Sequence, residues 1–170
     1  NNLMRDDLRS AGLIPQNEPY QALGFTLVGS GGETVSPATL AVSGKNAVVD
    51  WVLVELRNKL NPSQILATKS ALLQRDGDVV GVDGYTRLLF NVAADDYFVA
   101  IRHRNHLGAM TFGTKPLGTG ESGVDFTLPT ETMYGVNARQ TLSNGKRALW
   151  SGNTVRDTQV MYTGQFNDRD

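Results

Sequence analysis

The chain has no cysteine and only two histidines among its 170 residues. Disulfides are therefore impossible. The 16 Lys and Arg residues nearly balance the 17 Asp and Glu residues, which argues against the basic face that nucleic-acid binding needs. No apolar run approaches the roughly 18 to 20 residues that a membrane-spanning helix requires. We therefore expect no nucleic-acid partner and no membrane insertion, and a chain of this length can bury an ordinary hydrophobic core.

Short apolar segments separated by turn residues dominate the chain after residue 32. Residues 48–57 are apolar at both odd and even positions, which predicts a strand covered on both faces. Residues 65–73 predict a second strand, and the Asp76-Gly77-Asp78 turn that follows is typical of a tight hairpin. Further strands are expected at residues 40–42, 79–82, 87–92, 97–101, 107–112 and 124–128.

Strands at intervals of about 8 to 12 residues, joined by turns rich in Asp, Asn, Gly and Pro, are typical of an antiparallel sandwich. The sequence therefore predicts a mostly β fold, an antiparallel β-sandwich of the immunoglobulin type or a related one. One short helix is expected at residues 2–11, with Asn2 as its N-cap. We expect the sandwich module at residues 1–128 and an irregular C-terminal appendage at residues 129–170. The expected core consists of Trp51, Leu53, Leu72, Leu89, Tyr97, Val99 and Ile101.

The two histidines lie in one short segment that follows the 97–101 strand. This segment consists of Arg102, His103, Arg104, Asn105 and His106. One interpretation is a metal or anion site. The other is a structural corner, in which the histidines and Asn105 hydrogen-bond the backbone of a turn. We favour the corner because no third metal ligand is obvious, and we expect no enzyme because no nucleophile, base and orienting group stand at recognisable spacing.

Other polar segments are explained most simply by local structure. The glycine-rich stretch at residues 29–32 resembles a phosphate-binding loop only superficially, because no Lys and Ser/Thr pair follows it. A pair of carboxylates could serve a glycosidase, but Asp is also favoured in turns for its hydrogen bonds to the backbone. The carboxylates concerned are Asp76, Asp78, Asp83, Asp95 and Asp96.

Calcium is the one cofactor that the sequence suggests. Asn153, Asp157 and the carbonyl of Gln159 stand at positions one, five and seven of an EF-type loop. Val155 and Thr158 depart from that pattern, since the loop calls for an oxygen ligand and a glycine at their positions. The candidate calcium ligands are Asn153, Asp157, Asp168 and Asp170. A second, weaker candidate is the group Asp76, Asp78 and Asp83.

Three stretches carry a resemblance to a known kind of module. They are VVDWVLVELR at residues 48–57, ALLQRDGDVV at residues 71–80 and YFVAIRHRNHLG at residues 97–108. Together with MRDDLR at residues 4–9 and NDRD at residues 167–170, they resemble a module of large secreted, multidomain cell-surface proteins of Bacteroidota. The resemblance implies an extracellular or cell-surface location within adhesive or matrix proteins, no established activity, and a dockerin-style calcium loop in the tail.

The resemblance also suggests how the module would associate. Similar modules tend to have an apolar strand before residues 4–9, which this sequence does not show. A sandwich without that strand exposes an edge on which another chain's strand can pair. We therefore expect a non-catalytic extracellular structural module that forms part of a surface layer, filament or larger secreted protein and self-assembles by strand exchange.

The alternative is a carbohydrate-binding or adhesion module. Such a module presents exposed aromatic side chains to its ligand. The available aromatics are Tyr134, Trp150 and Tyr162. The expected partners are thus other copies of the chain, other domains of a larger secreted protein, or glycans.

Overall fold

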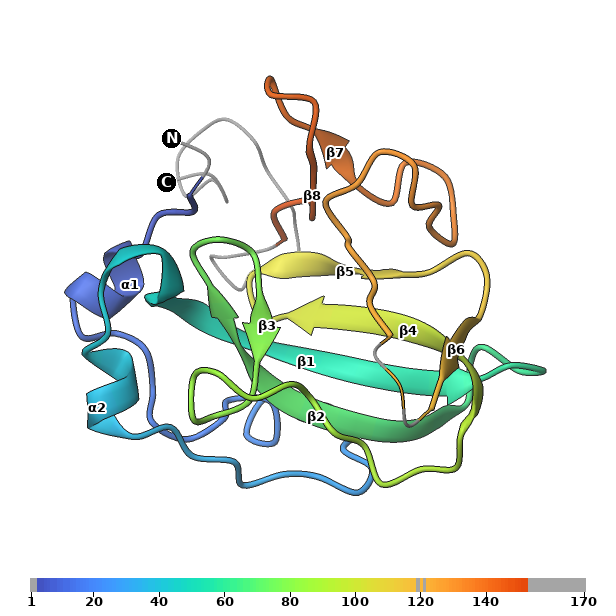
Figure 1. Cartoon of the computed structure of the whole chain (residues 1–170), viewed down its shortest axis with the longest axis horizontal. Helices are drawn as coiled ribbons and strands as arrows, with labels where there is room; N and C mark the ends of the chain where they lie inside the picture. Colours follow the sequence, from blue (N-terminus) through green and yellow to red (C-terminus); the bar gives the residue numbers. More distant parts are fainter. Residues whose placement is uncertain (1–2, 119, 121, 153–170) are drawn as a thin grey trace. The chain divides into compact units, whose positions relative to one another are not determined.

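Two long strands, β1 and β2, form the centre of a small sheet (Figure 1). The structure is a computed structural model and describes residues 3–118, 120 and 122–152. β1 spans Val48–Asn58 and β2 spans Ile65–Gln74. Consecutive residues of β1 are buried, so both of its faces are covered, as its continuous apolar run predicted. β3, Val79–Val80, pairs antiparallel with the end of β2.

The second group of strands is built on β4, Asp95–His103. β4 pairs antiparallel with β5, His106–Met110, and with β6, Lys115–Leu117. β7, Gln140–Thr141, and β8, Arg147–Ala148, form a separate antiparallel hairpin. The predicted mostly β, antiparallel fold is therefore confirmed.

The chain groups into two compact units, which are described separately below. The first unit comprises residues 1–56 and 65–92, and the second comprises residues 57–64 and 93–170. This division differs from the expected boundary after residue 128, which stays a prediction about where the sandwich module ends.

The core of the first unit lies between its sheet and an irregular segment at residues 14–35. Trp51 of β1 is fully buried, and its indole Nε1 donates a hydrogen bond to the carbonyl of Pro15 at 2.8 Å. Tyr20 is also fully buried, and its hydroxyl donates to the carbonyl of Trp51 at 2.8 Å. Ile14 and Val35 complete this side of the core. Because the described residues of this unit cover Trp51 with irregular chain, sandwich packing stays a prediction.

The described residues contain two short α-helices, although the sequence predicted one. α1 spans Asp7–Ser10, and its N-cap is Asp6, so it is much shorter than the expected helix at residues 2–11. Asn2, its expected cap, lies outside the described residues. α2 spans Pro37–Leu40 and a 3₁₀ turn spans Gly44–Asn46, so the expected strand at residues 40–42 is wrong. Within the described part of the chain, no helix is long and apolar enough to cross a membrane.

Most of the expected core is confirmed, with one error. Leu89 was expected in the core, but 81% of its surface is exposed. The expected strand at residues 87–92 does not form, because that segment pairs with no strand in the described structure. The six residues that are buried as expected are Trp51, Leu53, Leu72, Tyr97, Val99 and Ile101.

The strand expected at residues 124–128 is also wrong. The Asp125 carboxylate accepts hydrogen bonds from the backbone amide and the hydroxyl of Thr127, both at 2.7 Å. Such a local turn competes with strand pairing for the same backbone groups. The ordered strand of this region is β6, which begins at Lys115.

Candidate functional site

The histidine segment forms the turn between β4 and β5. His103 ends β4, and it lies opposite His106, which begins β5. Their Nδ1 atoms are 2.9 Å apart, and their rings meet edge to face with centroids 4.7 Å apart. The backbone amide of Asn105 donates to Nδ1 of His103 at 3.1 Å. Because Nδ1 of His103 is therefore an acceptor, we assign the shared proton to Nδ1 of His106.

A later segment of the chain covers the outer edge of this hairpin. The amide of Leu107 donates to the carbonyl of Trp150 at 2.8 Å, and the amide of Gly152 donates to the carbonyl of Asn105 at 2.9 Å. A side chain at Gly152 would meet the backbone of Asn105 and His106 at 3.5 Å. The turn therefore has main-chain contacts on its outer side as well as its own histidine contact.

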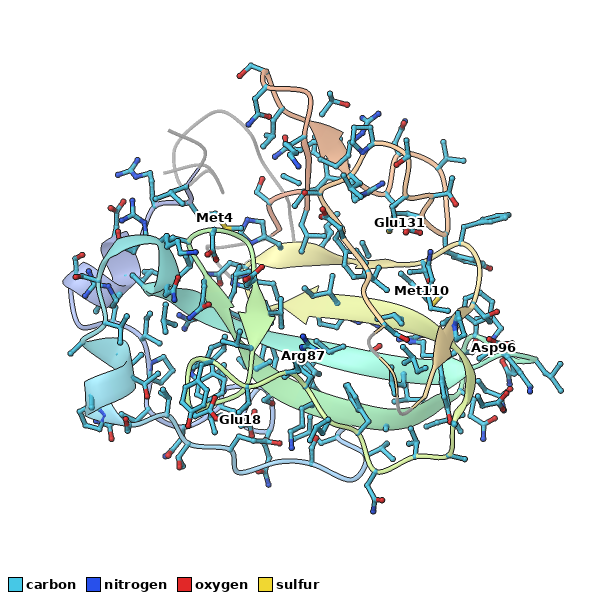
Figure 2. The ribbon with its side chains drawn as sticks, viewed as in Figure 1. Met4, Glu18, Arg87, Asp96, Met110 and Glu131 are labelled. Carbon is cyan, nitrogen blue, oxygen red and sulfur yellow. The ribbon has the colours of Figure 1, made fainter. Side chains whose placement is uncertain are left out.

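A shallow groove of about 250 Å³ crosses the second unit next to this corner. Five of its lining residues come from the two strands of the hairpin: Ala100 and Arg102 on β4, and Gly108, Ala109 and Met110 on β5. The remaining lining residues are Arg57, Pro62, Ser63 and Tyr134. Figure 2 labels Met110 on β5, which marks the position of the groove.

Arg102 crosses β5 at a glycine. A Cβ atom at Gly108 would lie 2.7 Å from Cδ of Arg102 and 2.9 Å from the carbonyl oxygen of Ile101. Real Cβ atoms do not approach other atoms so closely, and the carbonyl oxygen cannot easily move away. Gly108 is therefore required for Arg102 to lie across the hairpin and line the groove.

Arg57 and Tyr134 reach the same groove from distant parts of the sequence. The guanidinium of Arg57 donates to the carbonyl of Pro62 at 3.0 Å, which holds it beside the turn after β1. The amide of Tyr134 donates to the carbonyl of Met110 at 2.8 Å, which fixes its backbone to β5. The Tyr134 side chain remains 56% exposed. The residues that line the groove thus include two arginines and one tyrosine.

Ion pairs elsewhere in the second unit involve other groups. Nζ of Lys59 lies 2.6 Å from the carboxylate of Asp95. This hydrogen bond lowers the pKa of Asp95 and raises the pKa of Lys59. Nζ of Lys115 lies 2.8 Å from the carboxylate of Glu131. Neither ion pair involves a residue that lines the groove.

In the glycine-rich loop at residues 29–32, backbone amides donate to carboxylates of the same chain, whereas the amides of a phosphate-binding loop donate to the ligand. The amide of Gly31 donates to the Glu33 carboxylate at 3.1 Å, and the amide of Gly32 donates to the Glu18 carboxylate at 3.5 Å. Glu18, labelled in Figure 2, also accepts from the amide of Tyr20 at 2.7 Å. These amides therefore hold the loop in place.

Of the carboxylates considered for catalysis or calcium, Asp83 is engaged in a turn and Asp95 in an ion pair. Asp83 accepts from the amides of Tyr85 and Thr86 at 3.0 and 2.9 Å, and these bonds lower its pKa. Among the described residues, no three His, Cys, Asp or Glu side chains gather as a metal site. The four proposed calcium ligands, Asn153, Asp157, Asp168 and Asp170, lie outside the described residues.

The appendage contains a polar centre that sequence reasoning missed. Arg139 donates to the carbonyls of Phe126 at 2.5 Å and Leu128 at 3.2 Å, and also to the carbonyl of Glu131. One guanidinium therefore holds together a loop of the backbone. A lone arginine in a polar stretch carries no sequence signal for this role.

Of the three aromatics proposed for carbohydrate binding, two are described. Tyr134 lines the groove, and Trp150 is exposed, with its Nε1 donating to the carbonyl of Asn137 at 2.7 Å. Tyr162 lies outside the described residues.

Comparison with known proteins finds no family model that matches this chain. No curated protein matches it. No solved structure matches it. The resemblance to secreted modules of Bacteroidota therefore stays a prediction.

Proposed function

We propose that the chain is a non-catalytic structural module of an extracellular or cell-surface protein. The observation that supports this best is that several ionisable side chains accept hydrogen bonds from the backbone. Glu18, Asp83 and His103 each accept hydrogen bonds from nearby backbone amides. Side chains in such contacts organise loops and turns. The module would serve a surface layer, a filament or a larger secreted protein by holding a fixed shape.

Self-assembly by strand exchange is part of this proposal, and the edge of β2 is its proposed position. β3 pairs with Leu72 and Leu73, which are two of the ten residues of β2. Further along β2, the amide of Thr68 donates to the carbonyl of Val28 at 2.9 Å. A strand from another copy would pair along residues 65–71 in place of Val28.

The test is electron microscopy of the purified chain, with calcium and again after chelation. Filaments that survive chelation would support exchange at a strand edge without calcium. The matched variants are Leu66→Pro and Leu66→Ala. The amides of Thr68 and Gln74 both bond away from β1, so the amide of Leu66 faces the same outer edge.

Proline at position 66 removes that outward donor, whereas alanine keeps it. We therefore expect filaments from Leu66→Ala and none from Leu66→Pro, with both variants keeping the far-UV circular dichroism of the parent. Isolated particles from the parent chain under both calcium conditions would contradict self-assembly.

The second candidate function is adhesion by carbohydrate binding. The observation that favours it is the exposed ring of Tyr134 in the groove of the second unit. A glycan array probed with the labelled chain tests this candidate, and binding should fall in Tyr134→Ala. The matched control is Tyr85→Ala, because Tyr85 is also exposed but lies in the first unit.

A further inference from the structure

The hairpin of β7 and β8 (Figure 1) carries at its turn the only Asn-Gly pair of the sequence, Asn144-Gly145. Two backbone hydrogen bonds close the turn. The amide of Gly145 donates to the carbonyl of Leu142 at 3.0 Å, and the amide of Leu142 donates to the carbonyl of Lys146 at 2.9 Å. Gly145 has a φ of 80°, which glycine adopts without steric cost. Because Asn144 and Gly145 are both exposed, the pair is accessible to water.

The side chain of Asn144 is held against the backbone that follows it. Its Oδ1 accepts a hydrogen bond from the amide of Lys146 at 3.0 Å. This bond turns the side-chain carbonyl toward the backbone two residues ahead, past the nitrogen of Gly145. A donor at Oδ1 also stabilises the negative charge that develops on that oxygen when a nucleophile attacks the carbonyl carbon. The turn therefore supplies an electrophilic carbon, Cγ of Asn144, whose oxygen already has a hydrogen-bond donor.

The backbone nitrogen of Gly145 is an accessible nucleophile for that carbon. A Cβ atom at Gly145 would meet no heavy atom of the described residues within 4 Å, so the space beside its backbone is open. Other exposed asparagines precede residues with side chains, such as Asn91, which precedes Val92. A β-branched residue crowds the backbone beside it. Asn144 thus differs from these asparagines in its C-terminal neighbour.

We propose that Asn144 is a site of spontaneous deamidation in the folded protein. The amide of Gly145 first releases the carbonyl of Leu142 and loses its proton to water, and its nitrogen then attacks Cγ of Asn144. A new C–N bond forms, and the side-chain nitrogen takes up a proton and leaves as ammonia, which produces a cyclic succinimide. Water opens this ring at one of its two carbonyls. The products are aspartate and isoaspartate, and no oxidant, metal or enzyme takes part in any step.

Deamidation would change both the charge and the covalent path of the hairpin. Either product places a carboxylate at position 144, close in sequence to the cationic Lys146 and Arg147. Isoaspartate also adds a methylene to the main chain between residues 144 and 145. The pairing of β7 with β8 depends on the length of this loop. The isoaspartate product should therefore loosen the hairpin, whereas the aspartate product keeps an acceptor for the Lys146 amide.

The experiment is incubation of the purified whole chain at mildly alkaline pH and body temperature, followed by proteolytic digestion and mass spectrometry. Deamidation adds about 1 Da to the peptide that contains residue 144. Electron-transfer fragmentation then distinguishes aspartate from isoaspartate. We expect Asn144 to convert first, about tenfold faster than Asn91 and Asn137, which are also exposed but are not followed by glycine.

Two variants test the chemistry at the turn. Gly145→Ala places a methyl group beside the nucleophile and should slow the conversion of Asn144 about tenfold. Its matched control is Gly135→Ala, because Gly135 also has a positive φ and open space around a Cβ atom, so the same strain arises away from Asn144. Asn144→Gln should abolish the mass shift at this position, since the longer side chain would have to form a larger ring.

Three results would overturn the proposal. The first is a peptide with residue 144 that keeps its mass while a peptide with Asn91 or Asn137 gains it. The second is equal conversion in the parent and in Gly145→Ala, because the glycine would then play no part. The third is conversion of the parent only in urea, which would show that the folded turn protects Asn144.

Discussion

Two regions with little regular secondary structure, residues 14–35 and residues 124–152, are held in different ways. The first is fixed by side chains that enter the core, among them Tyr20 and Val35. The second is fixed by polar contacts, above all the carbonyls gathered by Arg139 and the main-chain bonds of Trp150 and Gly152. Burial of apolar surface contributes to global stability, whereas polar contacts at the surface define a local shape. Irregular chain can thus be ordered by either means, with different consequences when a contact is lost.

The largest effect should come from the buried region. Tyr20→Ala removes a fully buried ring and the hydrogen bond to the Trp51 carbonyl, so the free energy of unfolding should fall by about 3–5 kcal/mol. Urea denaturation followed by tryptophan fluorescence measures it. Tyr85→Ala is the control, since Tyr85 is 78% exposed and its loss should change stability by less than about 0.5 kcal/mol. Equal effects of the two substitutions would contradict the proposed role of burial in this region.

A smaller effect is expected at the histidine corner. His103→Ala removes the acceptor for the Asn105 amide and the contact with His106, so stability should fall by about 1 kcal/mol. His106→Ala keeps the Asn105 contact and should cost less. Thermal melting of the two variants makes the comparison. An unchanged melting temperature in His103→Ala would refute the structural-corner assignment.

The polar region should respond locally. Arg139→Lys keeps the charge but loses the planar set of donors that reaches three carbonyls, so the loop at residues 126–131 should open more often. Hydrogen exchange should accelerate at the amides of Leu128 and Glu131, while global unfolding changes by about 1 kcal/mol or less. Arg5→Lys is the control, because the Arg5 side chain is exposed and pairs with a neighbour in sequence. Unchanged exchange at both amides would show that Arg139 does not hold the loop.

The smallest effect concerns pH at the start of the chain. The hydrogen bond from Arg9, together with the charge of Arg75, lowers the pKa of Asp6. A carboxyl whose pKa is lower in the folded state contributes stability above its ordinary value, which is lost as pH falls through the folded value. Asp6→Asn should therefore flatten the acid side of the stability curve slightly, below about pH 4. Asp7→Asn is the matched control, and a change of slope in the control alone would contradict this assignment.

The sequence predicted the parts of the fold that depend on strong local patterns. The apolar run of β1 and the alternation of β4 each specify a strand, and both strands formed. Residues 87–92 have a similar apolar character, but a strand also needs a partner edge, which a local pattern does not reveal. Two signals were present but overlooked: Ser36 before Pro37, which caps α2, and the Asn144-Gly145 turn between β7 and β8.

The groove was less predictable than the fold. Tyr134 was singled out as an available aromatic, and Arg102 as part of the corner, but nothing local connects either of them with Arg57. Their meeting depends on the long-range pairing of the hairpin and on a backbone contact between residues 110 and 134. A site assembled in this way from separated segments leaves no spacing motif in the sequence.

The carboxylates of Glu18 and Glu33 accept hydrogen bonds from the backbone amides of the glycine-rich loop. Because these amides already donate to carboxylates of the same chain, phosphate or sulfate from a buffer would have to displace those carboxylates in order to bind the loop. Replacing both residues with alanine would leave these amides without their carboxylate acceptors. The amides of Gly31 and Gly32 would then be hydrogen-bond donors for an external anion. The loop would be a starting point for an engineered anion receptor.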